Sequence, residues 1–412
     1  MKPVVDSERL SAELDTLAGF SDVPAPAVTR VVFSAVDLAA RRWFKGLCAE
    51  AGLDTREDAV GNTYARWLGA DPDLPAVATG SHFDASPHSG RNDGTVGELG
   101  GLESIRALRR AGHRPRRSVE LILFTSEEPT RFGIGCLGSR LMSGSLAPES
   151  AASLEDRDGK TLEEVRTEAG FLGPLAGVAL GRDRYHAFVE LHIEQGPLLE
   201  REEIPLGIVT AIAAPASLRI EIEGEGGHAG AVLMPDRRDA FLAACEIALA
   251  VEAAARGTGS IDTVGTVGVC DVFPGVVNGV PSRVRIDVDV RDIELARRDG
   301  VLAAIEGACR SIGAARRVRV ASRTINRDAP ATCSPLVTQA LSEAAASAGL
   351  PYRTMVSRAY HDSSFMAEIA PTGMLFIPCR AGVSHRPDEF ASAAGIALGV
   401  EVLAGALQRL SA

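Results

Sequence analysis

The sequence has no long uninterrupted hydrophobic run, no closely paired cysteines and no excess of basic residues. A membrane-spanning helix needs about 18 or more consecutive apolar residues, so no membrane span is expected. The formal net charge is −11, which argues against nucleic acid as a partner because the phosphate backbone is also negatively charged. A small anionic substrate stays possible, since one well-placed arginine can outweigh a weak overall field.

The seven cysteines are scattered, odd in number and never spaced as C-x-x-C. This distribution indicates neither a disulfide framework nor a thiolate zinc site, and it favours a reduced, cytoplasmic compartment. The first 20 residues carry acidic side chains early and predict an amphipathic helix rather than a signal peptide.

A chain of 412 residues predicts two or three domains. Apolar runs at residues 76–81, 118–125 and 187–192 predict buried strands, and residues 95–108 show the spacing of an amphipathic helix. Alternation of strand and helix favours an α/β fold with a mostly parallel sheet.

The sequence pattern changes near residue 208. Residues 218–226 (LRIEIEGEG) alternate like a half-exposed strand, and an alanine-rich helix is expected over 238–255. Further strands are expected at residues 263–269 and 282–291, and the second of these alternates strictly from Val284 onward. Such a pattern is typical of an antiparallel α+β unit inserted into the first domain. The expected boundaries are residues 1–209 and 326–412 for the catalytic domain and 210–325 for the inserted domain.

Titratable side chains gather at four places where apolar runs end. Ligands bind beyond the carboxyl ends of the strands in open α/β sheets, so four loops could meet in one crevice. Each histidine taken singly has a structural explanation, and a Glu-Glu pair is usually a solvated turn, but one shared metal centre explains all of them together. The four groups are His82, Asp84 and Asp93; Glu127 and Glu128; Glu190, His192 and Glu194; and His385 with Glu389.

Imidazole and carboxylate ligands without cysteine suit zinc, manganese or cobalt rather than calcium. The number of candidate ligands exceeds what one catalytic ion needs. A site with two ions about 3.5–4 Å apart and a bridging carboxylate would use them fully. One glutamate of the 127–128 pair could then bind metal, leaving the other to take a proton from a water molecule.

Five stretches of the chain resemble the M20-type di-metal amidases. The resemblance covers roughly residues 5–410 and is to the branch that holds N-carbamoyl-L-amino acid, allantoate and ureidoglycolate amidohydrolases. It implies an aminopeptidase-like catalytic domain, an inserted domain that serves as lid and dimer interface, and a homodimer. The stretches are GSHFDASPHSGRNDG, TSEEPTRFGIGCLGSR, ELHIEQGP, GGHAGAVLMPDRRDA and GVSHRPDE.

The same resemblance assigns roles to individual residues. Glu127 would act as general base and then general acid, and Asp84 would orient the imidazole of His82. His228 of the partner subunit would stabilise the oxyanion. The implied metal ligands are His82, Asp93 and His192 for one ion and Asp93, Glu128 and His385 for the other, with Asp93 bridging. The implied substrate-binding residues are Gln195, Asn278, Arg291, Tyr360 and His361, with Arg291 holding a carboxylate.

The segment Ser357–Ser363 (SRAYHDS) narrows the expected substrate. Other carbamoylases carry glycine where this chain has Tyr360, and a tyrosine there would fill pocket volume and add a hydroxyl group. A small polar ureide is therefore favoured, and hydrolysis of ureidoglycolate to glyoxylate, ammonia and carbon dioxide is the expected reaction. The alternatives are an N-carbamoyl-L-amino acid hydrolase or β-ureidopropionase, an allantoate amidohydrolase, a peptidase or deacetylase of the wider superfamily, or a non-catalytic binding protein.

Overall fold

The computed structural model describes residues 3–412 and divides the chain into two compact units. The second unit ends six residues beyond the expected position 325 and also takes in residues 356–360, which the sequence had placed in the catalytic domain. This segment contacts the second unit through its backbone, since the carbonyl oxygen of Ser357 accepts the N–H of Ala213 at 2.8 Å, and the hydroxyl group of Tyr360 donates a hydrogen bond to Asp328 Oδ2 at 2.9 Å. The first unit comprises the chain up to Thr210, Thr332–Met355 and His361–Ala412, and the second comprises Ala211–Ala331 and Val356–Tyr360.

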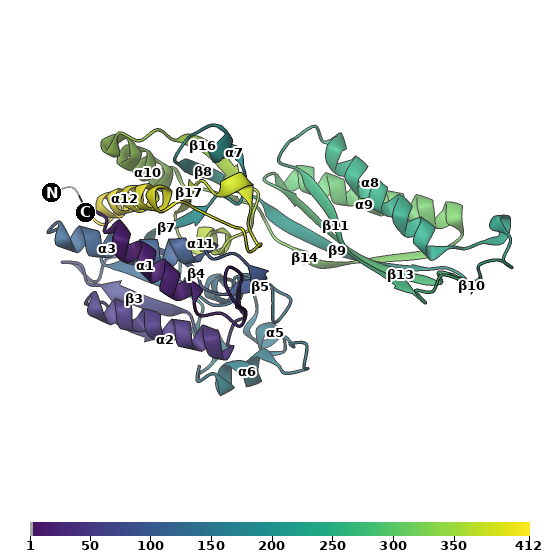
Figure 1. Cartoon of the computed structure of the whole chain (residues 1–412), viewed down its shortest axis with the longest axis horizontal. Coiled ribbons are helices and arrows are strands. Elements are labelled where there is room, and N and C mark those ends of the chain that lie inside the picture. The colour runs from purple at the N-terminus through teal and green to yellow at the C-terminus, as the bar shows by residue number, and fades with distance from the viewer. Residues whose placement is uncertain (1–2) are drawn as a thin grey trace. The chain divides into compact units, whose positions relative to one another are not determined.

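A mixed β-sheet forms the centre of the first unit, with strand order β15-β8-β17-β7-β4-β6-β3-β2 and β16 pairing with β8 (Figure 1). The four central strands β17, β7, β4 and β6 are parallel. Strands β8, β3 and β2 join them in antiparallel fashion, so the expected parallel arrangement holds at the centre only. The bounds are β2 Asp54–Glu57, β3 Thr63–Trp67, β4 Ala76–His82, β6 Val119–Phe124, β7 Tyr185–Ile193, β8 Gly207–Ile212, β15 Ala331–Thr332, β16 Arg353–Ser357 and β17 Thr372–Ile377.

Helices cover both faces of this sheet and bury two separate apolar layers. In β7, Val189 and Leu191 point into one layer and Phe188 into the other, so Glu190 and His192 share the face of Phe188. The first layer is covered by α1 Ser7–Ala18, α2 Ala35–Glu50, α3 Thr95–Arg110, α10 Pro335–Ala348 and α12 Ala393–Leu410. The second is covered by α4 Leu137–Ser143, α5 Pro148–Ala152, α6 Leu162–Glu168 and α11 Asp362–Ile369.

Shorter elements connect these layers. Strand β5 lies inside the loop that follows β4 and pairs with β1 in antiparallel fashion. The remaining bounds in this unit are β1 Val28–Arg30, β5 Ala85–Ser89, α7 Leu198–Arg201 and the 3₁₀ turns Leu175–Gly177 and Arg380–Gly382.

Helix α12 is, within residues 3–412, the one helix long and apolar enough to cross a membrane by length and composition. The sequence predicts no membrane span because no apolar run is long enough without interruption, and in this helix Glu401 interrupts the run. Half of its 18-residue window is buried, and Val400, Leu403 and Leu407 are part of the first apolar layer. These contacts show that α12 is apolar because it packs in the core.

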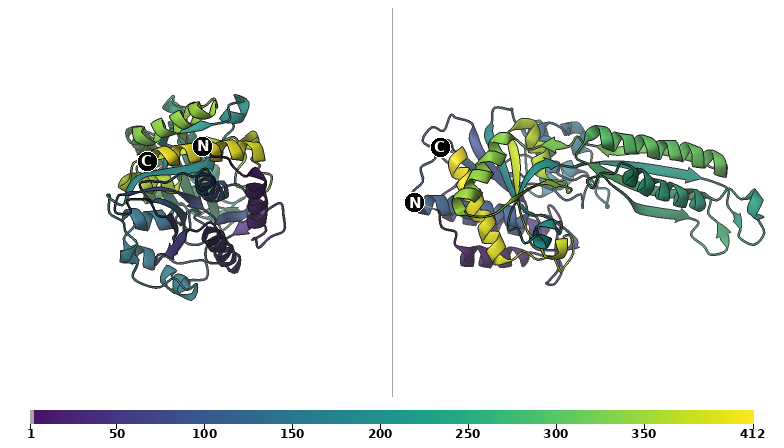
Figure 2. Two further views of the ribbon diagram at one scale, coloured as in Figure 1. Left: turned by 90° about the vertical axis from the view of Figure 1, so that its left-hand side faces the viewer. Right: turned by 90° about the horizontal axis from the view of Figure 1, so that it is seen from above.

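The second unit is a four-stranded antiparallel sheet of order β11-β13-β9-β14, with both long helices on one face (Figures 1 and 2). Val284, Ile286, Val288 and Val290 of β13 alternate into the apolar core under the helices. Strand β11 stands at one edge of the sheet. The bounds are β9 Ala214–Glu223, α8 Ala240–Gly257, β11 Val264–Phe273, β13 Arg283–Asp292, α9 Leu295–Arg316 and β14 Arg319–Arg327, with β10 Gly227–His228, β12 Gly279–Val280 and a 3₁₀ turn at Met234–Asp236.

Candidate active site

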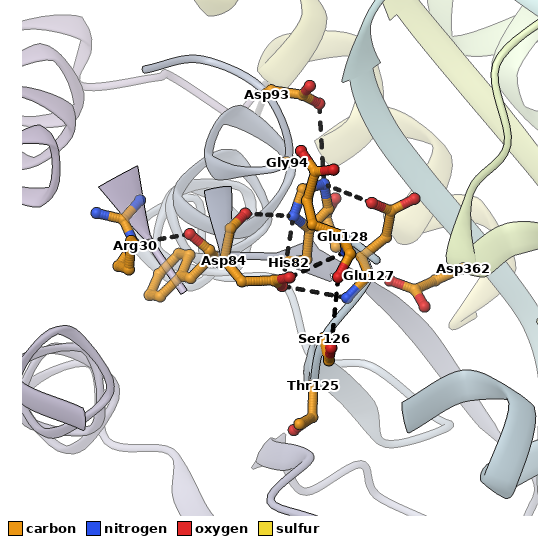
Figure 3. A network of polar contacts seen from close by, with 12 residues as sticks. Arg30, His82, Asp84, Asp93, Gly94, Thr125, Ser126, Glu127, Glu128 and Asp362 are labelled. Atoms are coloured by element: carbon orange, nitrogen blue, oxygen red, sulfur yellow. Dashed lines mark hydrogen bonds and ion pairs between the residues drawn. The ribbon is translucent and has the colours of Figure 1, made fainter. Parts of the chain in front are cut away.

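The predicted metal ligands lie at the carboxyl ends of the four adjacent parallel strands. His82 ends β4, Glu128 follows β6, and His192 lies near the end of β7. His385 is on the loop that follows β17. Because carboxyl ends of parallel strands meet at one edge of a sheet, residues far apart in the sequence converge there. Figure 3 shows Asp84, Glu127 and Glu128 gathered around His82.

Asp93 is shared by two groups of ligand atoms. Its Oδ1 lies 3.1 Å from His192 Nε2 and 3.8 Å from His82 Nε2. Its Oδ2 lies 3.0 Å from His385 Nε2, which is itself 3.3 Å from Glu128 Oε1. The structure thus forms two groups of three potential ligands, with one carboxylate common to both.

A glycine makes this return of the chain possible. Gly94 precedes α3 with a φ of 67°, and a Cβ atom there would lie 2.5 Å from the His82 ring. Any other residue would therefore meet both a strained backbone and the imidazole. Gly94 lets the loop bring Asp93 back beside the end of β4.

The donor set fits divalent ions. Within the residues that the structure describes, Glu128 Oε1 is buried without a hydrogen-bond partner, as expected of an oxygen reserved for a cation. A third group, Glu190, His192 and His361, also has ligand atoms close together. Both oxygens of Glu190 already accept hydrogen bonds from the hydroxyl groups of Ser81 and Ser363, so we do not assign an ion there.

The three histidines differ in how strongly they hold a proton. Burial lowers the pKa of His82 to about 4. Burial also disfavours the charged form of His192, but the hydrogen bond and negative charge of Asp93 outweigh it and raise the pKa to about 9. For His385 the hydrogen bond to Asp93 is the main cause, and it too raises the pKa to about 9.

Glu127 lies beside this cluster, and its side chain is 12% exposed. Its Oε2 is 3.7 Å from His82 Nε2, while its Oε1 accepts a hydrogen bond from Cys136 Sγ at 3.6 Å. Burial and the adjacent charge of Glu128 raise the pKa of Glu127 well above its usual range. A carboxyl group with a raised pKa can both accept and return a proton near neutral pH.

Asp84 contacts both His82 and the Glu127–Glu128 turn. His82 Nδ1 is 2.9 Å from the main-chain carbonyl oxygen of Asp84 and 3.7 Å from its carboxylate. The carboxylate accepts hydrogen bonds from the backbone N–H groups of Glu127 (3.2 Å) and Glu128 (2.9 Å). Orientation of the imidazole by the Asp84 side chain stays a prediction, and the same side chain holds the Glu127–Glu128 turn.

Two of the predicted substrate-binding residues lie next to the ligand cluster. Gln195 donates a hydrogen bond from Nε2 to Asp93 Oδ2 at 2.9 Å, and its Oε1 is buried without a partner in the described part of the chain. His361 is buried, with its ring centroid 4.5 Å from that of His192. The hydroxyl group of Tyr360 donates a hydrogen bond to Asp328 in the second unit, and its predicted place in the substrate pocket stays a prediction.

The other predicted residues lie in the second unit, and the structure brings only two of them together. His228 pairs with Gly279 in a short ladder, and the carbonyl oxygen of Asn278 accepts the N–H of Ala229 at 2.8 Å. Arg291 lies eight residues along β13 from Arg283, which is at the His228 end of the sheet. At about 3.4 Å per residue that distance is about 27 Å.

Four polar residues at this site have roles that the sequence did not assign. Glu190 binds two serine hydroxyl groups, and Glu194 accepts the N–H groups of Leu198 and Leu199 at the start of α7. Glu389 and Ser384 contact the Asp93 segment. Glu190, Glu194 and Glu389 follow or end apolar runs in the sequence, but no sequence signal separates a metal ligand from a residue that supports a ligand.

Comparisons with known proteins identify the family of this chain. Residues 78–409 match the model of peptidase family M20/M25/M40. The chain is 51% identical to ureidoglycolate hydrolase of Arabidopsis thaliana over 99% of this chain and 87% of that protein. Crystal structures of AtUAH in complex with glyoxylate and with (S)-hydroxyglycine each superpose with a TM-score of 0.92 at 50% identity, covering 100% of this chain and 99% of the other. The chain therefore belongs to peptidase family M20/M25/M40, a family of metal-dependent hydrolases.

Proposed function

We propose that this protein is a ureidoglycolate amidohydrolase. Water adds to the ureido carbonyl carbon, and the C–N bond to the glycolate nitrogen breaks. Carbamate and hydroxyglycine leave, and they decay to carbon dioxide, glyoxylate and two molecules of ammonia. The similarity to ureidoglycolate hydrolase over nearly the full length of both chains supports this substrate, and glyoxylate and hydroxyglycine are the ligands of the two AtUAH structures.

The observation that carries the chemistry is Asp93 between two ligand groups with Glu127 beside them. His82, Asp93 and His192 would hold one divalent ion, and Asp93, Glu128 and His385 a second. Bound there, the two ions would supply a Lewis acid and make a water molecule more acidic. Glu127 takes the proton from that water at Oε2, the oxygen that faces His82, and returns it to the departing nitrogen.

Arg291 and Gln195 offer hydrogen-bonding groups to the ureide. Asp289 Oδ1 accepts a hydrogen bond from Arg291 Nε at 2.8 Å, which orients the guanidinium and leaves its two terminal nitrogens for a carboxylate. The partnerless Oε1 of Gln195 can accept from the ureido N–H groups. His361, buried next to His192, completes the proposed binding site.

The dimensions of the second unit support a homodimer. Arg291 lies about 27 Å along β13 from Arg283, the end of the sheet near which His228 and Asn278 lie, and this is far more than a small ureide can span. If all three contact substrate, His228 and Asn278 must come from a second copy of the chain. The second unit would then serve as dimer interface and lid, and its two edge strands, β11 and β14, offer backbone for pairing.

The nitrogen and oxygen donors suit zinc or manganese, and cobalt is a third option.

Within residues 3–412 all seven cysteines are free thiols, which supports the cytoplasm as the compartment.

A substrate panel tests the proposed function. We expect the manganese-loaded protein to release ammonia fastest from ureidoglycolate, at about two molecules for each glyoxylate, with allantoate, N-carbamoyl-β-alanine and N-carbamoyl-L-amino acids much slower. Glyoxylate formation is measured in parallel. Faster turnover of an N-carbamoyl amino acid would instead establish the alternative carbamoylase activity.

Metal binding should release protons. Below pH 9 the metal-free protein holds a proton on His192 and on His385, because their pKa values are raised to about 9. A metal ligand must be neutral, so binding displaces these protons and metal affinity should fall as the pH is lowered from 9 to 6. Calorimetric titration with Mn²⁺ in buffers of different ionisation enthalpy measures the number released. Heats that do not depend on the buffer would contradict this expectation.

A further inference from the structure

Glu389 is a buried carboxylate that binds no candidate ligand atom yet contacts two of the three segments that carry ligands of the second ion. Its side chain is on the loop between His385 and α12, and it is 4% exposed. Oε1 accepts hydrogen bonds from the backbone N–H groups of Asn92 (2.7 Å) and Asp93 (3.1 Å). Oε2 accepts from the hydroxyl group of Ser384 at 2.9 Å.

Ser384 connects this carboxylate to both ligands. It directly precedes His385, and its Oγ is 3.0 Å from Asp93 Oδ2 as well as 2.9 Å from Glu389. A hydroxyl group has one proton, so it can donate to only one of these two carboxylates at a time. Asp93 Oδ2 also accepts a hydrogen bond from Gln195 Nε2 at 2.9 Å, so it keeps a donor when Ser384 donates to Glu389.

The surrounding backbone is shaped to admit Glu389. A Cβ atom at Gly90 would overlap the carboxyl group of Glu389, so only glycine lets the side chain reach Asn92 and Asp93. His385 needs such support more than the other ligands, because its side chain is 52% exposed and its backbone has a φ of 56°. Strand ends hold His82 and His192, whereas a loop holds His385.

We propose that Glu389 is a positioning residue that holds Asp93 and His385 at the spacing required by the second divalent ion. The inference rests on the proposed two-ion centre. Asp93 is a ligand of both ions, but the other two ligands of the first ion, His82 and His192, receive no hydrogen bond from Glu389, whereas the His385 loop contains it. Loss of Glu389 should therefore weaken the second ion more than the first.

Manganese titration of the full-length protein tests this inference. The wild type is expected to hold two ions per chain. In Glu389→Ala the weaker dissociation constant should rise about 10–100-fold, the usual cost of losing a residue that supports a ligand, while the tighter constant stays near the wild-type value. Glu389→Gln should recover most of the affinity, because the amide oxygen can still accept the two backbone N–H groups.

Asp58→Ala is the matched control. Asp58 is a half-buried carboxylate that accepts hydrogen bonds from the N–H groups of Val60 and Asn62 and from the hydroxyl group of Tyr64, and none of these groups belongs to a ligand segment. Its loss should lower thermal stability with both manganese constants unchanged. Thermal unfolding of Glu389→Ala in the presence of chelator measures its loss of stability without metal, for comparison with that of Asp58→Ala.

Two outcomes overturn the inference: both constants unchanged in Glu389→Ala, or both raised in parallel. If that variant does not fold, Ser384→Ala replaces it and must weaken the second ion alone, and unchanged constants again overturn the inference. A wild-type protein that binds fewer than two ions would refute the proposed two-ion centre instead.

Discussion

Replacing Glu127 by glutamine should lower kcat by at least about 100-fold, the scale of a lost general base. Glutamine has the same shape but cannot take a proton from water. Its backbone N–H still reaches Asp84, so the turn that carries Glu128 should stay in place. Steady-state glyoxylate production and metal content of the same preparation measure the effect.

Glu128→Gln is the matched comparison, because it changes the neighbouring residue in the same way. Glu128 Oε1 is an assigned ligand position 3.3 Å from His385 Nε2, so this variant should lose bound metal as well as turnover. Near-normal turnover in Glu127→Gln with metal retained would refute its role as the base. Loss of metal from both variants would show that Glu127 is also a ligand.

The second large effect is expected at His228. Replacing it by alanine should lower kcat by about 100-fold or more, the scale of a lost oxyanion donor. His228 lies in a short exposed strand of the second unit, so its removal leaves no cavity in the core. His88→Asn is the control. His88 is another exposed histidine, its positive φ tolerates asparagine, and we expect near-normal activity.

Mixed dimers distinguish the two possible origins of His228. In a hybrid of His228→Ala and Glu127→Gln subunits, one site has both intact residues only if His228 acts across the interface. Random mixing makes half of the dimers hybrid with one good site in two, so recovery should approach about one quarter of wild-type activity. No recovery, with hybrids demonstrated by differently tagged subunits, would place His228 and Glu127 of one chain in the same site.

Much of the metal site was predictable from the sequence because strand ends are local features. Apolar runs located the strands that end at or near His82, Glu128 and His192, and parallel strands bring such ends together. The family resemblance added Asp93 as the shared ligand and His385 as the most distant one along the chain. Periodicity also identified the second unit, since β13 alternates strictly under its helices.

Contacts between segments distant in the sequence decided the rest. Glu389 accepts a hydrogen bond from the backbone N–H of Asp93, which is 296 residues away in the sequence, and Tyr360 donates a hydrogen bond to Asp328. The Asp84 carboxylate contacts the N–H groups of a turn more than forty positions away, while its carbonyl group contacts His82. The sequence by itself determined which residue types end each strand, because periodicity and side-chain chemistry are local. Only the tertiary structure decided which oxygen of each carboxylate faces a candidate ion and which accepts a hydrogen bond, because packing sets that choice.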